Sequence, residues 1–210
     1  MRVMKIGVLF SGRGTNLKSI IERSKQEGCC YEVVVAITDN LSAPGIQLAT
    51  ELGVNCVVVP NKNWEWHIYD ILNKFNVELT VLAGFMRILP TLFCMRWENR
   101  CINIHPSLLP KYKGLHTHRR ALEAGDVIHG CSIHFVTPEL DDGPIVAQEQ
   151  VLIQPGDTEQ SLAARVLERE NLLYPEVIQC IASRKITSFD NKVSFNGVKI
   201  ESPLSLNDLL

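Results

Sequence analysis

The sequence has little net charge and no long apolar run. Its 210 residues include 21 lysine and arginine residues and 23 aspartate and glutamate residues, so the formal net charge is −2. A chain this close to neutral has no bulk attraction for nucleic acid or for an anionic membrane, and an anionic ligand must be held by a local site. No stretch approaches the roughly 18 to 20 apolar residues of a membrane span. We therefore expect a globular chain that binds neither nucleic acid nor membrane.

A disulfide framework is also missing. The seven cysteines are an odd number, and no two of them form a Cys-x-x-Cys pair. Most lie within apolar segments, as buried thiols in a reducing compartment do. The first ten residues carry an apolar run that is too short for a signal peptide. These observations predict a cytoplasmic protein.

Short apolar runs alternate with segments of helical spacing in the first half of the chain, which is typical of parallel β-α-β units with right-handed crossovers. Later, two apolar runs flank a short acidic loop and predict an antiparallel pair, and the tail predicts a terminal hairpin. We expect an α/β fold with a doubly wound, mostly parallel sheet and an antiparallel C-terminal extension. The predicted strands cover 3–10, 31–38, 54–59, 77–85, 101–104, 130–137 and 144–152, with tail strands near 185–188 and 193–200.

We expect one domain over 1–210, with halves at 1–100 and 101–210, because no linker or low-complexity segment divides the chain. A long helix after Asp157 and Thr158 is predicted to be capped by one of these two residues and to be kinked or interrupted at Pro175.

A glycine-containing loop follows the first predicted strand. In Ser11-Gly12-Arg13-Gly14-Thr15-Asn16, the glycines allow backbone N–H groups to approach an anion at the positive end of the next helix, which Thr15 or Asn16 can cap. Leu17 stands where the dinucleotide fingerprint needs a small residue, and the Gly-Lys-Ser/Thr of a P-loop is missing. From this loop alone, a phosphate site and a plain structural turn are both open.

Another loop ends the most apolar run. The segment Gly84 to Leu89 can place backbone groups, together with Met86, Ile88 and Leu89, around a flat ligand, and a tight strand-to-helix turn is the alternative.

Asn103, His105 and Asp141 are the polar residues best suited to chemistry. An imidazole beside a carboxylate is a general acid/base unit, and an amide can donate to a developing oxyanion. Together they indicate acyl transfer without a serine or cysteine nucleophile, although the sequence alone does not bring Asp141 near His105. A zinc site from His116 and His118 with the same residues is the rival, but their spacing matches no zinc motif. The histidines at 129 and 134 are interpreted as structural.

The segment Asn-Ile-His-Pro-Ser-Leu-Leu-Pro-Lys-Tyr-Lys-Gly-Leu-His-Thr-His at 103–118 resembles the signature of the folate-dependent phosphoribosylglycinamide formyltransferases. The resemblance extends over most of the chain. It implies a Rossmann-like formyltransferase fold and transfer of a formyl group from 10-formyltetrahydrofolate to glycinamide ribonucleotide (GAR) in purine biosynthesis. It also implies that no metal takes part. We expect a monomer or a homodimer.

Residue roles follow from the same resemblance. Asn103, His105 and Asp141 match the catalytic residues, with Asn103 and a protonated His105 stabilising the oxyanion. The remaining matches form two sets: Gly14, Thr15, Asn16 and Glu170 for GAR, and Met86, Arg87, Ile88, Leu89, Asn103, Thr137, Leu140 and Asp141 for the folate.

The sequence departs from the family pattern beside Asp141, and also in a short loop after the third predicted strand, where the family's arginine is missing. Where the family usually reads Leu-Asp-Gly-Gly, this chain has Leu140-Asp141-Asp142-Gly143, and a second carboxylate there is expected to raise the pKa of either aspartate. Within the same fold, a formyltetrahydrofolate deformylase and a methionyl-tRNA formyltransferase are rivals. Each usually carries an extra domain, N-terminal in the deformylase and C-terminal in the tRNA enzyme, so we expect neither of these two activities.

Overall fold

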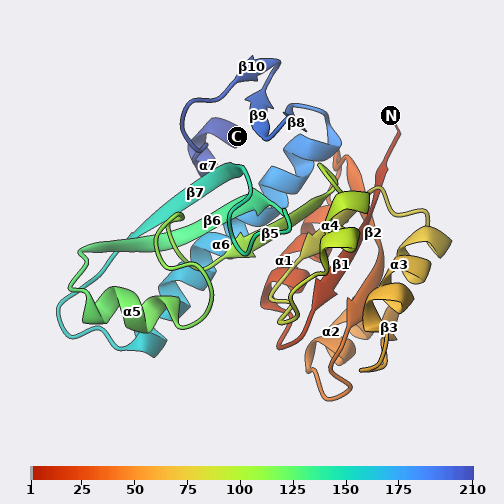
Figure 1. Cartoon of the computed structure of the whole chain (residues 1–210), viewed down its shortest axis with the longest axis horizontal. Coiled ribbons are helices and arrows are strands. Elements are labelled where there is room, and N and C mark those ends of the chain that lie inside the picture. Colours follow the sequence, from red (N-terminus) through yellow and green to blue (C-terminus); the bar gives the residue numbers. More distant parts are fainter. Residues whose placement is uncertain (1) are drawn as a thin grey trace. The chain divides into compact units, whose positions relative to one another are not determined.

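The structure is a computed structural model that describes residues 2–210, and the chain divides between Asn103 and Ile104 into two compact units. The strands of the first unit are all parallel and are ordered β3-β2-β1-β4-β5 (Figure 1). They are β1 (Met4–Phe10), β2 (Tyr31–Thr38), β3 (Cys56–Val58), β4 (Leu79–Leu82) and β5 (Cys101–His105). The helices between them are α1 (Thr15–Ser24), α2 (Gly45–Glu51), α3 (Trp64–Lys74) and α4 (Thr91–Arg96).

The central strands β1, β2 and β4 are apolar because they are buried, as expected of a parallel sheet between helices. Two predicted strands are shorter in the structure. Only Cys56–Val58 pairs with β2, and only Leu79–Leu82 forms β4. Val77 and Phe85 lie outside β4 but are buried in the flanking turns, which accounts for the longer apolar run in the sequence. Apolar runs in this sequence therefore mark burial more reliably than strand length.

The second unit contains an antiparallel pair, β6 (Ile128–Phe135) and β7 (Ile145–Leu152), as predicted. The long helix α6 (Glu159–Ala182) packs on both strands and contacts α5 (Thr117–Glu123). A three-stranded antiparallel sheet and a short helix complete the unit: β8 (Ile186–Phe189), β9 (Lys192–Phe195), β10 (Val198–Lys199) and α7 (Leu206–Leu209). The predicted α/β class, with a mostly parallel sheet and antiparallel strands near the C-terminus, is confirmed.

The ends and the interior of α6, and the tail strands, show how local context changes the structure. Thr158 caps α6 through a reciprocal capping box with Ser161, as expected. The prediction that Pro175 interrupts this helix is wrong: α6 continues through it, because Tyr174, Pro175 and Val177 are all buried and their packing outweighs the lost hydrogen bond. The predicted tail strand 193–200 is divided into β9 and β10 by a turn at Asn196 and Gly197, which both have positive φ.

Among residues 2–210, no helix combines the length and the apolarity that are needed to cross a membrane.

Candidate active site

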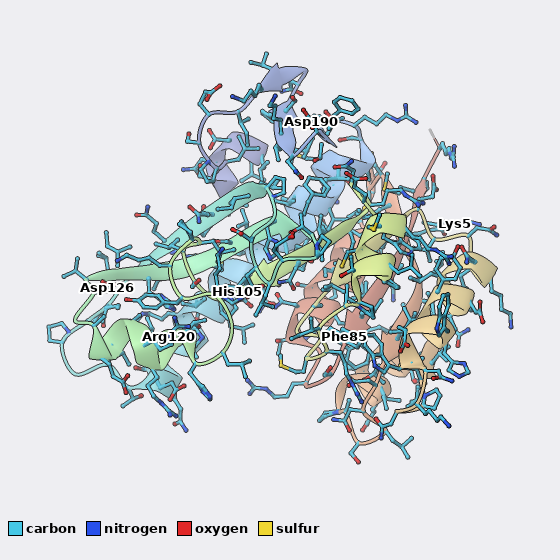
Figure 2. All side chains as sticks on the ribbon, viewed as in Figure 1. Lys5, Phe85, His105, Arg120, Asp126 and Asp190 are labelled. Carbon is cyan, nitrogen blue, oxygen red and sulfur yellow. The ribbon has the colours of Figure 1, made fainter. Side chains whose placement is uncertain are left out.

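The candidate site begins at the end of β5. Asn103 and His105 lie two residues apart on this strand, so their side chains point to the same side. His105 is buried, and Figure 2 labels it. Beyond it, Pro106 and Pro110 prevent the strand from continuing, and the chain enters the connection to α5.

Asp141 lies beside His105, as the resemblance implied. It comes from the connection between β6 and β7, where it adopts a φ of 51°. Its Oδ2 lies 3.4 Å from Nδ1 of His105 and accepts a 2.9 Å hydrogen bond from the backbone N–H of Gly114. Its Oδ1 lies 3.7 Å from Nε2 of His134. One carboxylate is thus placed between two imidazoles.

The partner of the second ring nitrogen assigns the tautomer of His105. Nε2 lies 2.9 Å from the backbone oxygen of Tyr112, and because a carbonyl oxygen only accepts, Nε2 carries the hydrogen. In neutral His105 the nitrogen that faces Asp141, Nδ1, is therefore unprotonated. A proton taken up by the ring arrives at Nδ1, where it points toward the carboxylate.

The pKa values of both groups are lowered. Burial lowers the pKa of His105 and outweighs the opposing effects of the Tyr112 carbonyl and Asp141. Burial disfavours the Asp141 carboxylate, but the imidazole of His134, the N–H of Gly114 and the nearby His105 outweigh it, so the pKa of Asp141 is lowered. The lowered pKa of His105 favours a neutral imidazole beside the Asp141 carboxylate in the free protein at neutral pH. The protonated His105 that the resemblance implies belongs to the reaction intermediate, and it stays a prediction.

The expected increase in the pKa of Asp141 from its neighbour Asp142 is also wrong. The side chain of Asp142 forms an ion pair with Lys113, which offsets its charge.

Reasoning from the sequence missed His134. The signal was available, since the predicted hairpin pairs the end of one strand with the start of the next. In the structure His134 pairs with Ile145, and this register brings it to the loop that carries Asp141.

A buried polar network holds the loop after β5. Ser132 on β6 donates to the backbone oxygen of Ser107 and accepts from the N–H of Leu109, at 2.6 and 2.9 Å. Gln148 on β7 donates to Ser132 and to the oxygen of Leu109, both at 2.8 Å. The two strands therefore fix the backbone that leads to the Tyr112 carbonyl.

The other predicted residues of the second unit lie on α6 and in the β6–β7 connection. Glu170 is buried on α6. The pKa of the Cys131 thiol is raised mainly by burial and, to a smaller extent, by the charge of Glu170. In the β6–β7 connection, Thr137 donates to the oxygen of Glu139, and Leu140 is largely exposed.

In the first unit, the glycine loop leads directly into the first turn of α1. Gly14 is the N-cap of α1 with a φ of 77°, and a Cβ there would lie 3.0 Å from Cα of Gly45. Thr15 is the first helical residue and Asn16 is buried. The predicted cap by Thr15 or Asn16 is wrong, because the left-handed turn at Gly14 carries the chain directly into the helix.

Ser11 fixes the segment after β4. Its N–H donates to the oxygen of Gly84 at 3.1 Å, and its Oγ accepts the N–H of Met86 at 2.9 Å. The same Oγ donates to Oδ1 of Asp39 at 2.6 Å, and Nε of Arg87 donates to Oδ2 at 2.7 Å. Ser11 and Asp39 are residues that the sequence analysis did not single out for this role.

The side chains of the predicted folate segment point in different directions. Met86 and Ile88 are largely exposed, whereas Leu89 is buried. The guanidinium of Arg87 is held by Asp39 and by Asn61 Oδ1 at 2.5 Å. Only Met86 and Ile88 of the three apolar side chains are open to a ligand.

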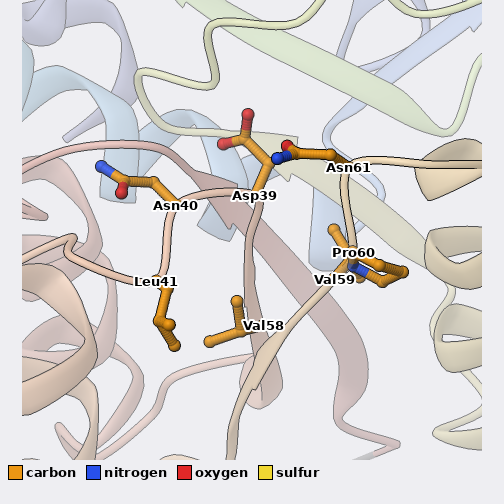
Figure 3. A pocket seen from close by; sticks show the side chains of 7 residues that line it. All are labelled: Asp39, Asn40, Leu41, Val58, Val59, Pro60 and Asn61. Atoms are coloured by element: carbon orange, nitrogen blue, oxygen red, sulfur yellow. The ribbon is translucent and has the colours of Figure 1, made fainter.

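A separate cavity of about 700 Å³ lies where β2 and β3 end. In Figure 3, Asp39 and Asn61 lie together on one side of it, and Leu41 and Val58 lie on another. Asp39 is its one titratable residue, and both of its oxygens already accept hydrogen bonds. This cavity therefore offers no free acid or base.

Within residues 2–210, no group of three or more histidine, cysteine, aspartate or glutamate side chains has the arrangement to hold a metal ion. His118 instead lies 3.1 Å from His129, nitrogen to nitrogen.

The fold and this site define a class of enzymes that transfer formyl groups, and the chain belongs to the formyl transferase family, whose model matches residues 4–178. It is 38% identical over 203 residues to phosphoribosylglycinamide formyltransferase of Escherichia coli. The match covers 94% of this chain and 96% of that protein. The solved structure of the Coxiella burnetii phosphoribosylglycinamide formyltransferase matches with a TM-score of 0.91 at 37% identity, over 97% of this chain and 99% of that chain.

Longer proteins also contain this sequence pattern. The chain is 39% identical over 186 residues to a trifunctional purine biosynthetic protein, adenosine-3, of Gallus gallus. The match covers 86% of this chain but only 18% of that protein.

Proposed function

We propose that this chain transfers the formyl group of 10-formyltetrahydrofolate to the amine of glycinamide ribonucleotide, giving formyl-GAR and tetrahydrofolate in de novo purine biosynthesis. The observation that carries the proposal is the His105–Asp141 pair, in a chain that matches phosphoribosylglycinamide formyltransferases over nearly its whole length. The seven free thiols fit the reducing cytoplasm.

In the first step, the amine nitrogen of GAR attacks the formyl carbon, and the carbonyl oxygen becomes an oxyanion. The side-chain amide of Asn103 donates to this oxygen. His105 is not a direct donor in the arrangement described, because its Nε2–H is directed at the Tyr112 carbonyl and its Nδ1 faces Asp141.

In the second step, the attacking nitrogen loses a proton and N10 of the folate gains one. The pair of Nδ1 and the Asp141 carboxylate takes the proton from the amine and returns it to N10 as the bond between that nitrogen and the formyl carbon breaks. Asp141 stabilises the imidazolium that forms in between. No proton or electron is left over, and the folate leaves as tetrahydrofolate.

The proposed binding roles follow the family resemblance. The N–H groups at Gly14, Thr15 and Asn16 bind the phosphate of GAR at the start of α1, and Glu170 binds its ribose and amine end. Met86, Arg87, Ile88 and Leu89, with Thr137, Leu140 and Asp141, hold the pterin and benzoyl parts of the folate. For Leu89 the contact is through the backbone, because its side chain is buried.

A direct assay tests the proposal. The purified chain is mixed with GAR and 10-formyltetrahydrofolate, and formylated product is followed with and without the amine acceptor. His105→Ala is expected to lower kcat by about 10²- to 10⁴-fold with an unchanged far-ultraviolet circular dichroism spectrum. Folate hydrolysis without acceptor, or near-normal turnover in the variant, would contradict it.

A further inference from the structure

The segment 111–116 has a strained backbone that needs external support. Tyr112, Gly114 and His116 all have φ between 57° and 78°, and only the second is a glycine. The hydroxyl of Tyr112 donates to Asp126 at 2.8 Å. The guanidinium of Arg120 donates to the oxygen of Lys113 at 2.7 Å (Figure 2 labels Arg120 and Asp126).

This segment holds both members of the acid/base pair through its backbone. The oxygen of Tyr112 receives the Nε2–H of His105, and the N–H of Gly114 binds Oδ2 of Asp141. The position of the segment therefore sets the relation between imidazole and carboxylate.

Lys113 and Asp142 form an ion pair directly beside this contact. Nζ of Lys113 lies 2.5 Å from Oδ1 of Asp142. Lys113 directly precedes Gly114 and Asp142 directly follows Asp141, so the ion pair flanks the hydrogen bond between Gly114 and Asp141. An exposed ion pair of this kind usually adds little stability. This ion pair links the same two loops as the hydrogen bond from the backbone N–H of Gly114 to the Asp141 carboxylate, one residue away on each loop.

We propose that Lys113 and Asp142 are positioning residues that keep the Asp141 carboxylate directed at Nδ1 of His105. The inference rests on the proposed function, since it assigns the pair a role in that reaction. It also accounts for the unusual Asp142: its carboxylate does not oppose Asp141 because Lys113 neutralises it while holding the loop.

The experiment measures the pKa of His105 by NMR titration of its imidazole Cε1–H in Lys113→Met. If the ion pair positions Asp141, its loss moves the carboxylate away and the pKa of His105 falls further, by roughly half a unit. Direct electrostatics has the opposite sign, because removal of a positive charge makes the imidazolium easier to form. The charged or titratable groups that act on this imidazole are not changed in the variant; they are Asp141, His134, Arg120, His118 and His129.

Lys111→Met is the matched control. It removes the same charge from the same loop, but Lys111 pairs with Asp126 at 3.1 Å and not with the Asp141 loop. There the pKa of His105 is expected to stay constant or to rise slightly. Lys113→Arg, which keeps the charge, is expected to restore the parent value. A rise in the pKa of His105 in Lys113→Met, equal to that of the control, would overturn the proposal.

Turnover gives a second test that does not depend on Lys113→Met folding. Asp142→Asn is expected to lower kcat by about tenfold with little change in KM for either substrate. A kcat within twofold of the parent would overturn the positioning role. The NMR titration requires no turnover, so a protein that fails to transfer formyl groups rejects the proposed function without deciding the geometry of the pair.

Discussion

Asp39 and Asp141 are similar aspartates in two different environments. Their side chains are 11% and 8% exposed, and the pKa of each is lowered against the opposing effect of burial. Both oxygens of Asp39 accept short hydrogen bonds, from Ser11 and Arg87. Asp141 accepts one backbone N–H, and its other neighbours are two imidazoles at 3.4 and 3.7 Å.

This difference in hydrogen-bond partners distinguishes a structural carboxylate from one that can take part in proton transfer. A carboxylate saturated by a serine and an arginine has no partner that titrates near neutral pH, so it fixes structure. A carboxylate with loosely placed imidazoles can share a proton with them. Burial and the direction of the pKa shift are the same for the two residues. The identity of the partners is what distinguishes them.

The largest expected effect tests this distinction through turnover. Asp141→Asn keeps the side-chain shape but removes the base, and kcat should fall by about 10²- to 10⁴-fold. Asp39→Asn disturbs Arg87 and the segment proposed to bind the folate, so it should act mainly on KM for the folate and keep kcat within about tenfold of the parent. Steady-state kinetics of both variants measure these effects. Equal losses of kcat would contradict the distinction between Asp39 and Asp141.

The free energy of unfolding should be reduced more by Asp39→Asn than by Asp141→Asn. Asp39→Asn leaves the Arg87 guanidinium without its charged partner, and we expect the free energy of unfolding to fall by about 1.5 to 3 kcal/mol. Asp141→Asn should cost less, because only one short hydrogen bond is weakened. Urea titrations at pH 7 measure both, and a larger loss for Asp141→Asn would contradict the assignment of Asp39 as the structural residue.

A smaller effect is expected from acid. The pKa values of His105, His118 and His129 are lowered mainly by burial, for His129 to about 4, whereas the first unit contains one histidine, His67, which is exposed. Because their folded pKa values lie below the unfolded value near 6.5, these histidines stabilise the fold fully above pH 6.5. That contribution is lost as the pH falls toward 4.

Hydrogen exchange at pH 7 and pH 5 tests this prediction, after correction for the intrinsic pH dependence of exchange. Amide protection should decrease within 104–135 while the strands β1, β2 and β4 keep theirs. Replacing His129 by glutamine should weaken the response, since a glutamine does not acquire charge. Uniform loss over both units would show that the histidines are not its cause.

The parts of the site that follow from local rules could be predicted from the sequence. Two prolines placed Asn103 and His105 at a strand end, and the acidic loop between two apolar runs predicted the β6–β7 pair. Asp141 was assigned by resemblance, because no local rule brings it to His105. The roles of Ser11 and Asp39 depend on hydrogen bonds between residues 28 to 75 positions apart, which no periodicity encodes.

Some errors came from applying a local rule without its spatial context. Thr15 and Asn16 are good capping residues, yet the close approach of Gly45 selects a left-handed glycine as the N-cap. Pro175 breaks isolated helices, yet packing on both sides of it keeps α6 continuous.

The contact between Gly14 and Gly45 also limits which substitutions the chain can accept. A Cβ at Gly45 would lie 2.5 Å from the ring of Phe10, and one at Gly14 would press on the backbone of Gly45. Neither position can compensate for a change at the other, since both are already at the minimum size. A saturation library selected for growth without external purines should therefore return glycine at both positions, 31 residues apart, although neither one supplies an acid or a base.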